Sequence, residues 1–504
     1  MNMKEAITTA TNLKTTENGA IALSTTLNPI YDLFAFGGAY RNKKVECIHQ
    51  LFQDAYLYDK TLALKCLFYL RDIREGQGER RIFRESMKWL AEHDPQKTKE
   101  LLPFIPEYGR FDDLFVFFNT PIEKDLLEFL SYLFRSACMM VEDEEVILPD
   151  PINQYKQFLP LIFKWMPSID TSSETSRKQA RKLANYLSLS PKKYRQILSY
   201  ARNYLKIVER LMSDNRWNEI NFDKLPAKAA LLYSGTFARR KETKNRYSKE
   251  LKEGKIKAKS DNLFPYDILQ KLEKASTVEE RWLAEMAWDN MPNFVDSTER
   301  HNILCVCDTS GSMEECGALI KAISLSIYFA ERLNGLFHNK ILTFSRHPKF
   351  LDVSQPTLLN KYEYIKENML VDITNLEAVF AMLLRIALSG EVKREDFITE
   401  LIILSDMEID SPYTLGVSRG KLSTTLDTIK ENWESMTDYP FPYLYLWNLD
   451  ARHNTLLSND LLYSKNHTYL SGYSARTFKN ILSGKRGWDM VLDVLNSPRY
   501  AQIN

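Results

Sequence analysis

The sequence predicts a chain in two parts, an all-α module followed by an α/β domain whose parallel sheet is covered by helices on both faces. Residues 27–299 place apolar side chains at helical spacing between recurring proline and glycine breakers. Residues 300–504 alternate short, continuous apolar runs with helical stretches, as expected of strands buried on both sides. Residues 1–26, which begin with a polar, threonine-rich stretch, are interpreted as a flexible N-terminal arm.

In the helical module, helices are expected over residues 59–70, 82–90 and 124–140, where apolar residues share one face. Breakers separate the helical stretches at Gly76, Gly78, Pro103, Pro106, Gly109, Pro149, Pro151, Pro167, Pro191 and Pro226. Strand-like alternation is scarce, and no clean repeat period is present. We therefore expect antiparallel helix pairs packed side by side, as in an α-solenoid.

The character of the sequence changes near residues 296–301. Strands are expected over residues 302–307, 340–344, 400–404 and 442–447. Helices are expected over residues 316–337, 375–388 and 422–436. Because strands that alternate with helices run parallel, their carboxyl ends should meet at one edge of the sheet, where ligands of such sheets bind.

The composition excludes several classes of protein. The 504 residues are 44% apolar and 26% charged, which is typical of a globular chain rather than a disordered one. No stretch approaches the roughly 18 apolar residues of a membrane span, and the first residues lack the apolar segment of a secretory signal. The six cysteines form no CxxC pair, so we expect free thiols and a reducing, cytoplasmic location. Because no membrane-spanning stretch is present, we also expect no membrane partner.

Charge is distributed unevenly along a nearly neutral chain. The net charge is +1, yet residues 171–206 hold nine Lys and Arg against one acidic residue, and residues 236–259 hold ten against three. Basic segments between acidic flanks point to a polyanion or to an acidic partner.

Oxygen-bearing side chains are expected to converge at the carboxyl edge of the sheet. They follow the first strand as a DxSxS pattern, follow the strand over 400–404, and precede the helix over 375–388; the set is Asp308, Ser310, Ser312, Thr374 and Asp406. Asp372 is an alternative ligand to Thr374. Oxygens without imidazole or thiol suit Mg²⁺ or another divalent cation and do not suit zinc. Hydroxyl ligands leave the ion poorly neutralised, so it would attract an acidic side chain or a phosphate oxygen.

Two other interpretations of the DxSxS segment stay open. It can be a helix N-terminus capped by Ser or Thr after a glycine turn. It can also hold a serine nucleophile, but His301 and His338 are not spaced to act as its base, and no P-loop, GxSxG or HExxH pattern occurs. A metal-dependent hydrolase of phosphodiesters ranks third, since no paired carboxylates at two-metal spacing are visible. The chain is therefore not expected to be an enzyme.

The five oxygen ligands, in this order and on these elements, resemble the metal-ion-dependent adhesion site of von Willebrand factor A domains. The whole layout is similar to that of the TROVE/Ro-autoantigen class, and most similar to an uncharacterised family with the same domain pairing. Segments that carry this resemblance are 18–20, 67–74, 108–114, 164–165, 194–195, 265–266, 405–408, 447–448 and 471–474, with Gly76, Gly78, Glu79, Arg80, Glu209 and Trp217. It implies a HEAT-like helical-repeat module and a Rossmann-like von Willebrand A domain that form a ring or arc, with RNA bound on a basic surface and in a central hole.

The candidate RNA contacts are basic residues of the helical module. They are Arg177, Lys178, Arg181, Lys182, Lys192, Lys193, Arg195, Arg202, Arg239, Arg240, Lys241, Lys244 and Arg246. Cations at this density would neutralise several phosphates, and Phe237 and Tyr247 among them are expected to stack on unpaired bases. The alternative is a solvated basic surface, or pairing with acidic residues of the same chain.

Two charged segments are assigned to structure rather than chemistry. A buried ion network is expected at the interhelix turn that holds Arg71, Arg74, Glu75, Glu79 and Arg80. Asp112 and Asp113 are expected at a helix N-terminus, where carboxylates favour the helix dipole. Trp165, Trp217 and Trp447 are expected in the core.

The leading hypothesis is a non-catalytic RNA-binding scaffold of the Ro type. Basic helices would hold a small structured RNA or single-stranded ends, and the Mg²⁺-binding domain would close the ring or recruit a partner. The alternative is a metal-dependent adaptor whose ion captures a carboxylate of a protein partner, without RNA.

Overall fold

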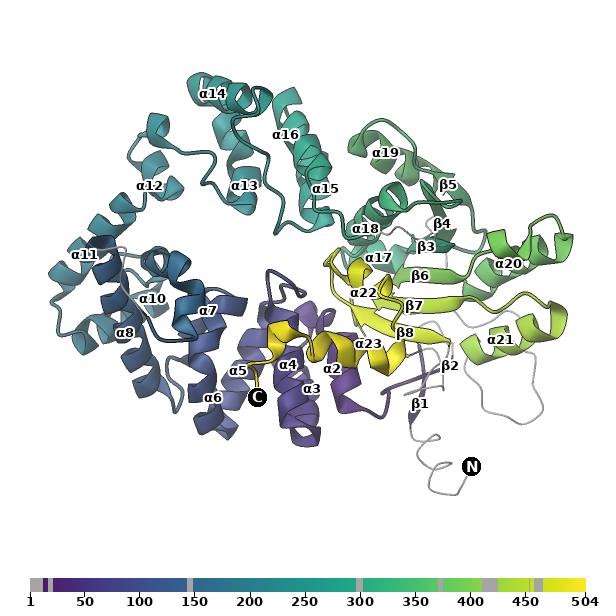
Figure 1. Ribbon diagram of the computed structural model, residues 1–504, viewed down its shortest axis with the longest axis horizontal. Coiled ribbons are helices and arrows are strands. Elements are labelled where there is room, and N and C mark those ends of the chain that lie inside the picture. The colour runs from purple at the N-terminus through teal and green to yellow at the C-terminus, as the bar shows by residue number, and fades with distance from the viewer. Residues whose placement is uncertain are drawn as a thin grey trace. The chain divides into compact units, whose positions relative to one another are not determined.

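The computed structural model describes residues 12–16, 21–142, 148–295, 302–369, 375–409, 425–452, 454–456 and 466–504. A mostly helical N-terminal region is followed by a mixed sheet with helices, which confirms the predicted order of a helical part and an α/β part (Figure 1).

The chain divides into two compact units whose limits differ from the predicted division at residue 300. The sheet unit comprises residues 1–70, 75–82 and 258–504, and the helical unit comprises residues 71–74 and 83–257. The first and last helices of the predicted helical module thus belong with the sheet. Sequence periodicity finds helices but carries no information on which distant segment covers their apolar face.

The N-terminal part of the sheet unit holds two short strands and three longer helices. Its elements are β1 (Leu13–Thr15), β2 (Ile21–Leu23), α2 (Pro29–Gly37), η1 (Tyr40–Asn42), α3 (Val45–Tyr58) and α4 (Lys60–Arg71). β1 and β2 pair antiparallel, and Leu23 bridges to Leu456, so the predicted arm over residues 1–26 contains paired strands. Asn28 caps the N-terminus of α2, and its side chain accepts hydrogen bonds from the amides of Ile30 and Tyr31.

Long-range hydrogen bonds fasten α2 to the far end of the sheet. The hydroxyl of Ser471, at the end of strand β8 (His467–Ser471), donates to the carbonyl of Phe34 at 2.9 Å and accepts from the amide of Gly38 at 3.0 Å. The amide of Tyr469 donates to the buried hydroxyl of Tyr31 at 3.1 Å. A Cβ on Gly38 would lie 2.5 Å from the Gly472 nitrogen, so only glycine allows this approach.

Six strands form one mixed sheet in the described part of the chain, in the order β5-β4-β3-β6-β7-β8. They are β3 (Ile303–Asp308), β4 (Lys340–Phe344), β5 (Phe350–Asp352), β6 (Glu400–Ser405), β7 (Tyr443–Asn448) and β8 (His467–Ser471). All neighbours are parallel except β4 and β5. The order reverses between β3 and β6, and open α/β sheets bind ligands outside the carboxyl ends of the strands at that point.

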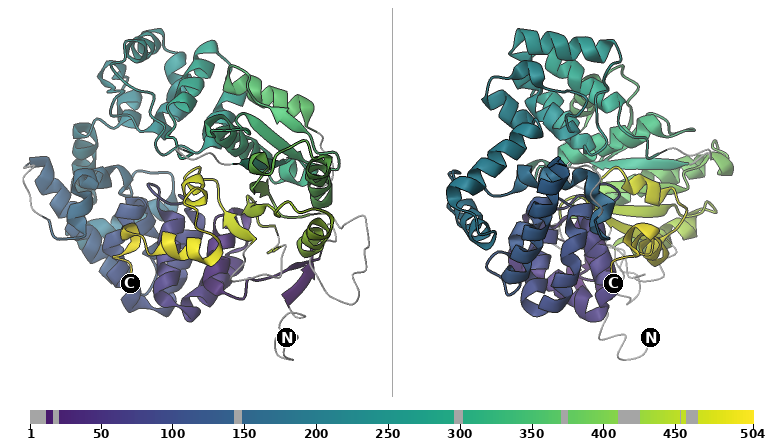
Figure 2. Two further views of the ribbon diagram at one scale, coloured as in Figure 1. Left: turned by 45° about the vertical axis from the view of Figure 1, so that its right-hand side comes forward. Right: turned by 60° about the vertical axis from the view of Figure 1, so that its left-hand side comes forward.

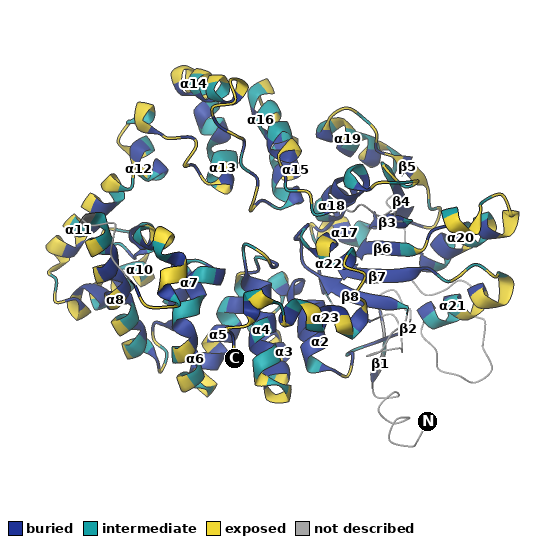
Figure 3. Ribbon diagram, in the orientation of Figure 1, coloured by how far each residue is buried: buried dark blue, intermediate teal, exposed yellow. Residues whose placement is uncertain are grey.

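The sheet unit also contains helices, several of which flank the sheet (Figures 1 and 2). Their bounds are α15 (Pro265–Glu273), α16 (Val278–Asp289), α17 (Gly311–Glu315), α18 (Leu319–Arg332), α19 (Leu358–Asn368), α20 (Leu376–Ser389), η6 (Arg394–Asp396), α21 (Thr425–Met436), α22 (Thr477–Ile481), α23 (Gly487–Leu495) and η7 (Pro498–Tyr500). α18 packs against β3, β4 and β6, and α2 and α23 pack against β8. Every residue of β3, β7 and β8 is buried, so both faces of these strands are covered (Figure 3).

The helical unit contains a series of α-helices and short 3₁₀ helices in its described residues. They are α5 (Arg81–His93, from Phe83 onward), α6 (Pro95–Leu101), η2 (Leu102–Phe104), α7 (Ile105–Tyr108), η3 (Phe111–Phe117), α8 (Glu123–Glu142), η4 (Ile152–Leu161), α9 (Ile162–Trp165), α10 (Glu174–Tyr186), α11 (Pro191–Tyr204), α12 (Val208–Ser213), η5 (Trp217–Glu219), α13 (Ala227–Ala238) and α14 (Lys241–Lys252). Consecutive helices pack on one another, as in α10 with α11 and α13 with α14. Ser173 and Ser190 cap α10 and α11 at their N-termini.

Candidate functional site

The end of β3 places a buried carboxylate at the carboxyl edge of the sheet. The strand consists of buried residues up to Asp308, whose side chain is 0% exposed. The amide of Ser310 donates to Asp308 Oδ1 at 2.9 Å, and the hydroxyl of Ser405 donates to Asp308 Oδ2 at 2.5 Å. The hydroxyls of Ser310 and Ser312 lie 2.9 Å apart at the start of α17. One carboxylate and two hydroxyls therefore meet in this turn.

The neighbouring strand β6 places a second buried carboxylate at the same edge. Asp406 follows the last residue of β6 and is 0% exposed. The backbone then turns at Met407, whose φ of 64° is left-handed. This turn allows the amide of Glu408 to donate to Asp406 Oδ1 at 3.2 Å. The Nη2 of Arg452 donates to Asp406 Oδ2 at 3.0 Å.

The two carboxylates repel each other in a dry environment. Burial and the charge of Asp406 together raise the pKa of Asp308 to about 7, although hydrogen bonds from Ser405 and Ser310 act in the opposite direction. The described cation in contact with this pair is Arg452, and its side chain is 28% exposed. Among the described residues, Arg452 pairs with Asp406 and no cation pairs with Asp308, which leaves the edge short of positive charge.

The edge continues beyond the end of β7 with residues that the sequence prediction did not include. Asp450 is buried, and burial raises the pKa of its carboxyl. It accepts a hydrogen bond from Asn42 Nδ2 at 3.0 Å. Lys321, on α18, donates to the hydroxyl of Tyr473 at 3.2 Å. The rule that carboxyl ends of parallel strands meet at one edge would also have found Asp450, because it follows the predicted strand 442–447 closely; Arg452 and Asn42 carry no such signal.

Two buried side chains along this edge have no hydrogen-bond partner in the part of the chain that the structure describes. Both amide atoms of Asn448, at the end of β7, and the hydroxyl of Ser345, just after β4, are unpaired. Their residues are 3% and 1% exposed. Asn448 is in register with Ser405, the donor to Asp308. Buried polar atoms without partners are unfavourable, so the edge still has capacity for a polar ligand or water.

The chemistry of these side chains fits a divalent cation. The structure brings Asp308, Ser310, Ser312 and Asp406 to one edge, while Thr374 and its alternative Asp372 lie outside the described residues. No three His, Cys, Asp or Glu side chains in the described ranges lie close enough together to hold a metal ion. The proposed set relies instead on two carboxylates completed by hydroxyls, which are oxygen donors of the kind that Mg²⁺ accepts.

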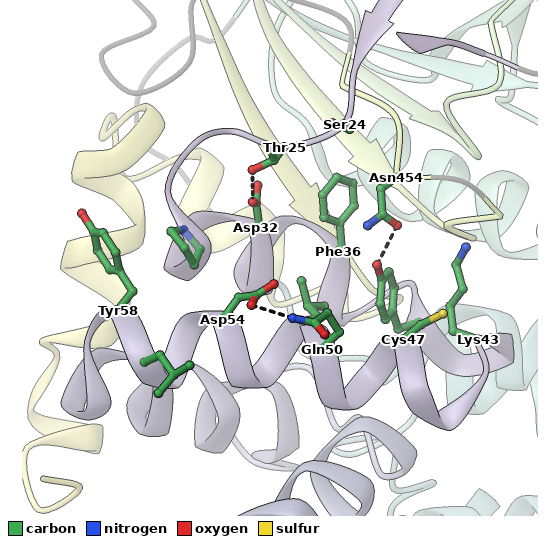
Figure 4. Close-up of a pocket in the computed structure, with 14 residues that line it drawn as sticks. Ser24, Thr25, Asp32, Phe36, Lys43, Cys47, Gln50, Asp54, Tyr58 and Asn454 are labelled. Carbon is green, nitrogen blue, oxygen red and sulfur yellow. Dashed lines mark hydrogen bonds between the residues drawn. The ribbon is translucent and has the colours of Figure 1, made fainter. Parts of the chain in front are cut away.

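A separate cavity lies between α2 and α3 (Figure 4). It measures about 710 Å³, and Thr25, Asp32, Phe36, Asp54 and Tyr58 are among the residues that line it. Its carboxyl groups are already engaged, because Thr25 donates to Asp32 and Gln50 donates to Asp54 (Figure 4). The carboxylates of the sheet edge do not line this cavity.

The candidate RNA contacts fall into two groups in the structure. Exposed residues among them are Lys178, Arg181, Lys192, Lys193, Arg195, Arg239, Arg240 and Lys241. Lys178 pairs with Glu174 at 2.8 Å, and Arg195 lies 3.4 Å from Asp170. Arg240 lies over the ring of Trp217, 4.3 Å from its centre. These side chains remain within reach of solvent, and their role in RNA binding stays a prediction.

The other candidates hold the helical unit together. Arg202 donates to the carbonyls of Phe163 and Met166, each at 2.8 Å. Arg246 donates to carbonyls of Trp217, Asn218 and Ile220. The remaining members of this group are half-buried Arg177, which donates to Thr171 and Ser172, Lys182, which pairs with Glu123, and half-buried Lys244. Guanidinium groups that satisfy loop carbonyls fix the backbone and have fewer donors left for phosphate.

The expected stacking of Phe237 and Tyr247 on bases is wrong. Phe237 is 1% exposed and Tyr247 is 6% exposed, and both rings contact Phe222 in the core between α13 and α14. In α14, Thr243, Tyr247 and Leu251 form the buried face at a spacing of four residues, and this helical period was readable in the sequence.

A second group of buried carboxylates lies in the helical unit. Asp113 Oδ2 accepts from Arg71 Nε at 2.8 Å and Nη2 at 2.7 Å, and its Oδ1 accepts from Arg84 at 2.6 Å. Asp112 accepts from Arg84 at 2.8 Å and from Arg110 at 2.6 Å. Arg71 is 1% exposed and Asp113 is 0% exposed. We call these five side chains the arginine cluster.

The arginine cluster corrects the predicted ion network in its partners. Arg71 is buried and paired as expected, but with Asp113 rather than with a neighbour in sequence. Glu79, in the sheet unit, is paired with Arg41. Both aspartates lie in the first turn of η3, as predicted, where Asp113 also accepts from the amide of Arg110. A Cβ on Gly109 would lie 2.4 Å from Asp113 Oδ2, so the cluster requires glycine there.

Two further findings concern the chain as a whole. All six cysteines are free thiols, and Cys305 and Cys307 are buried in β3. Among the described residues, no helix combines the length and the apolar character that a membrane crossing requires.

Comparison with known proteins finds relatives without an established role. Residues 302–493 match a family described as a domain of unknown function (DUF7788), and residues 16–158 and 161–297 match a domain of unknown function (DUF2828). Uncharacterized protein L728 of Acanthamoeba polyphaga mimivirus is 26% identical over 519 residues, which cover 96% of this chain and 87% of that protein. Because the second description covers more than half of the chain, the chain belongs to the DUF2828 family.

Proposed function

We propose that this chain is a non-catalytic scaffold that binds a divalent cation, Mg²⁺ or a similar ion, at the carboxyl edge of its sheet and uses the ion to capture an acidic side chain of a protein partner. The observation that carries this proposal is the pair of fully buried carboxylates, Asp308 and Asp406; among the described residues, the partly exposed Arg452 pairs with Asp406 and no cation pairs with Asp308. Buried charges are stable only when they are paired or coordinate a metal.

The residues that would hold the cation are Asp308, Ser310, Ser312 and Asp406, with Thr374 as the expected fifth ligand. The ion would supply positive charge and open coordination positions at a site with few waters. The two carboxylates and Arg452 carry a net charge of about −1, so a divalent cation leaves about +1. An acidic group of a partner neutralises this remainder, whereas a cationic group does not.

The resemblance described above supports the same role. The strand order with one reversal between β3 and β6, and the DxSxS turn at that reversal, are the features expected of a von Willebrand A domain. We extend the resemblance to the helical unit, whose packed helix pairs we propose to be a HEAT-like solenoid. Both assignments are proposals about family likeness, and the cation site stands on its own geometry.

Isothermal titration calorimetry of the full chain with MgCl₂ and MnCl₂ tests the cation site. We expect saturable binding at one site, its loss in Asp308→Asn, and wild-type binding in Asp489→Asn, which changes an exposed carboxylate of α23 in the same unit. Wild-type binding by Asp308→Asn would refute the site.

A second candidate function is RNA binding by the helical unit, as in the Ro type. The observation that favours it is the run of exposed cations on α10 and α11, where Arg181, Lys192 and Lys193 face solvent. Affinity for a polyanion through such cations falls linearly on logarithmic axes as salt rises. A salt titration with labelled RNA tests this candidate, and the absence of binding at low salt would exclude it.

A further inference from the structure

Helix α11 presents two large aromatic rings to solvent. Tyr200 is 66% exposed and Tyr204 is 50% exposed, while Tyr194, Leu198 and Ala201 on the opposite side are buried. The buried side anchors the helix in the unit, so the exposed rings contribute little to its packing. Exposed aromatic residues in a group mark interaction surfaces more often than isolated ones do.

The exposed face of α11 also has a charge of one sign. Lys192, Lys193, Gln196, Ser199 and Asn203 are exposed together with the two tyrosines, and the helix contains no acidic residue. Lys193, Gln196, Tyr200 and Tyr204 follow one another at steps of three or four residues and so lie on one face. The two rings are about 6 Å apart along the helix axis. This tyrosine–lysine face combines cations with π-surfaces, and the carboxylate that the structure places against α11, Asp170, lies at Arg195 rather than at the two lysines.

We propose that the tyrosine–lysine face binds single-stranded RNA, with Lys192 and Lys193 near phosphates and with Tyr200 and Tyr204 stacked against successive unpaired bases. This inference rests on the RNA-binding candidate above and names the form of RNA and the residues that contact its bases. Sequence-tolerant binding of single strands uses this pairing of a cationic path with aromatic platforms. Bases in a duplex are stacked on each other, so their faces cannot reach the rings.

The choice of partner follows from charge and from the state of the rings. Lys192 and Lys193 are exposed and α11 contains no acidic residue, so a polyanion is the complementary ligand of this face. Tyr200 and Tyr204 have the exposure that stacking demands, in contrast to the buried Tyr247 and Phe237. The tyrosine–lysine face can therefore stack on bases without forming any sequence-specific hydrogen bond.

Fluorescence anisotropy with the full chain and a labelled oligouridylate tests this proposal over a range of salt concentrations. Tyr200→Ala with Tyr204→Ala is expected to weaken binding about tenfold or more per ring, with the slope of log affinity against log salt unchanged, since stacking releases no counterions. Lys192→Gln with Lys193→Gln is expected to lower the magnitude of that slope by about 1.4, because each lysine neutralises one phosphate of a single strand.

Matched variants separate the contribution of the aromatic rings from that of the hydroxyls and from the effect of removing any exposed tyrosine. Tyr200→Phe with Tyr204→Phe keeps the rings and should retain wild-type affinity, and Tyr58→Ala removes a tyrosine of α3 that is 61% exposed and should have no effect. A blunt-ended duplex RNA should bind the Tyr→Ala variant as well as the wild type. Circular dichroism confirms that each variant is folded.

The outcomes distinguish this inference from the function beneath it. If the oligouridylate binds and the Tyr→Ala variant keeps wild-type affinity, the tyrosine platform is refuted and RNA binding stands. If the Tyr→Phe variant is as weak as the Tyr→Ala variant, the hydroxyls rather than the rings carry the contact and stacking is refuted. If no RNA binds the wild type at low salt, both the tyrosine platform and RNA binding by the helical unit are refuted.

Discussion

The arginine cluster and the carboxyl edge of the sheet each bury two aspartates, but they differ in how these charges are balanced. Asp112 and Asp113 face three arginines, and every carboxylate oxygen has a guanidinium donor at 2.6 to 2.8 Å. In the described part of the sheet edge, Asp406 pairs with Arg452, whereas Asp308 is held by a hydroxyl and an amide.

This difference shows in the protonation of the carboxyl groups. Burial tends to raise the pKa of Asp112, but the hydrogen bonds and charges of Arg110 and Arg84 outweigh it, and the pKa is lowered. Burial and the charge of Asp406 raise the pKa of Asp308 to about 7. The compensated pair in the arginine cluster is structural, whereas the undercompensated pair at the sheet edge is the arrangement that the proposed cation site requires.

Breaking the arginine cluster should have the largest effect. Asp113→Asn removes the charge that three groups contact and leaves Arg71 buried without its partner. We expect a loss of about 3–5 kcal/mol in the free energy of unfolding. Urea denaturation measures it, with Glu100→Gln, an exposed carboxylate of the same unit, as control. A loss below about 1 kcal/mol would mean that the cluster contributes no more than a surface ion pair.

The contribution of the sheet edge to stability should change with pH in the opposite direction to that of the arginine cluster. Since the folded pKa of Asp308, about 7, lies above its ordinary value of 3.8, the folded state holds a proton in this window that the unfolded state has released. Raising the pH from 4 to 7 in EDTA should therefore destabilise the wild type relative to Asp308→Asn by about 2–4 kcal/mol. Asp112, with its lowered pKa, contributes fully above 3.8 and loses its contribution only as the pH falls further.

Denaturation of the wild type and Asp308→Asn at several pH values measures this difference. A constant difference between the two proteins across the window would show that Asp308 is ionised in the folded state throughout, and would remove the contrast between the two sites.

Adding the cation should offset the loss of stability that the two buried carboxylates of the sheet edge cause. At a Mg²⁺ concentration near 100 times the dissociation constant, the wild type should gain about 2.7 kcal/mol of stability. Asp308→Asn should gain nothing, and Asp113→Asn should gain as much as the wild type. Thermal unfolding with MgCl₂ and with EDTA compares the three proteins; equal shifts in wild type and Asp308→Asn would place the ion elsewhere.

Arg452→Gln should strengthen cation binding at the sheet edge. Arg452 donates to Asp406 Oδ2 and competes with any cation for that oxygen. Its removal is expected to tighten Mg²⁺ binding about three- to tenfold, a modest change because the side chain is 28% exposed and screened by solvent. Calorimetry measures the affinity, and weaker binding in this variant would make Arg452 a support of the site rather than a competitor.

The smallest effect is expected at an exposed pair in the helical unit. Lys97 lies 2.6 Å from Glu100 at a spacing of three residues. Lys97→Gln should change the free energy of unfolding by about 0.5 kcal/mol or less. Denaturation of this variant gives the baseline against which the Asp113→Asn loss is judged.

The sequence predicts the local elements of the sheet unit well. Continuous apolar runs identified β3, β4, β6 and β7 to within one or two residues. β8 was missed because His467 and Thr468 interrupt its apolar character, and these polar residues are tolerated because the strand is covered by α2 and α23. The packing of these two helices on β8 is known only from the tertiary structure.

The candidate site was predictable to the extent that it follows from topology. Asp308 and Asp406 come directly after predicted strands, so their meeting at one edge could be inferred from parallel pairing. Arg452 sits in a loop without a periodic pattern, and its contact with Asp406 depends on how that loop folds back. The partners of Arg71 and Glu79 also come from distant segments, which charge patterns near the turn cannot identify.

The fastening of α2 to β8 has a consequence for biosynthesis. The amide of Gly38 and the hydroxyl of Ser471 that receives it are separated by 433 positions along the chain. At about 5–20 residues per second, a ribosome takes roughly 20–90 s to cover this interval. During that time the intervening helical unit can fold, while the face of α2 that will meet β8 has no native cover. The nascent chain therefore has to keep this apolar face from aggregating until its last strand is made.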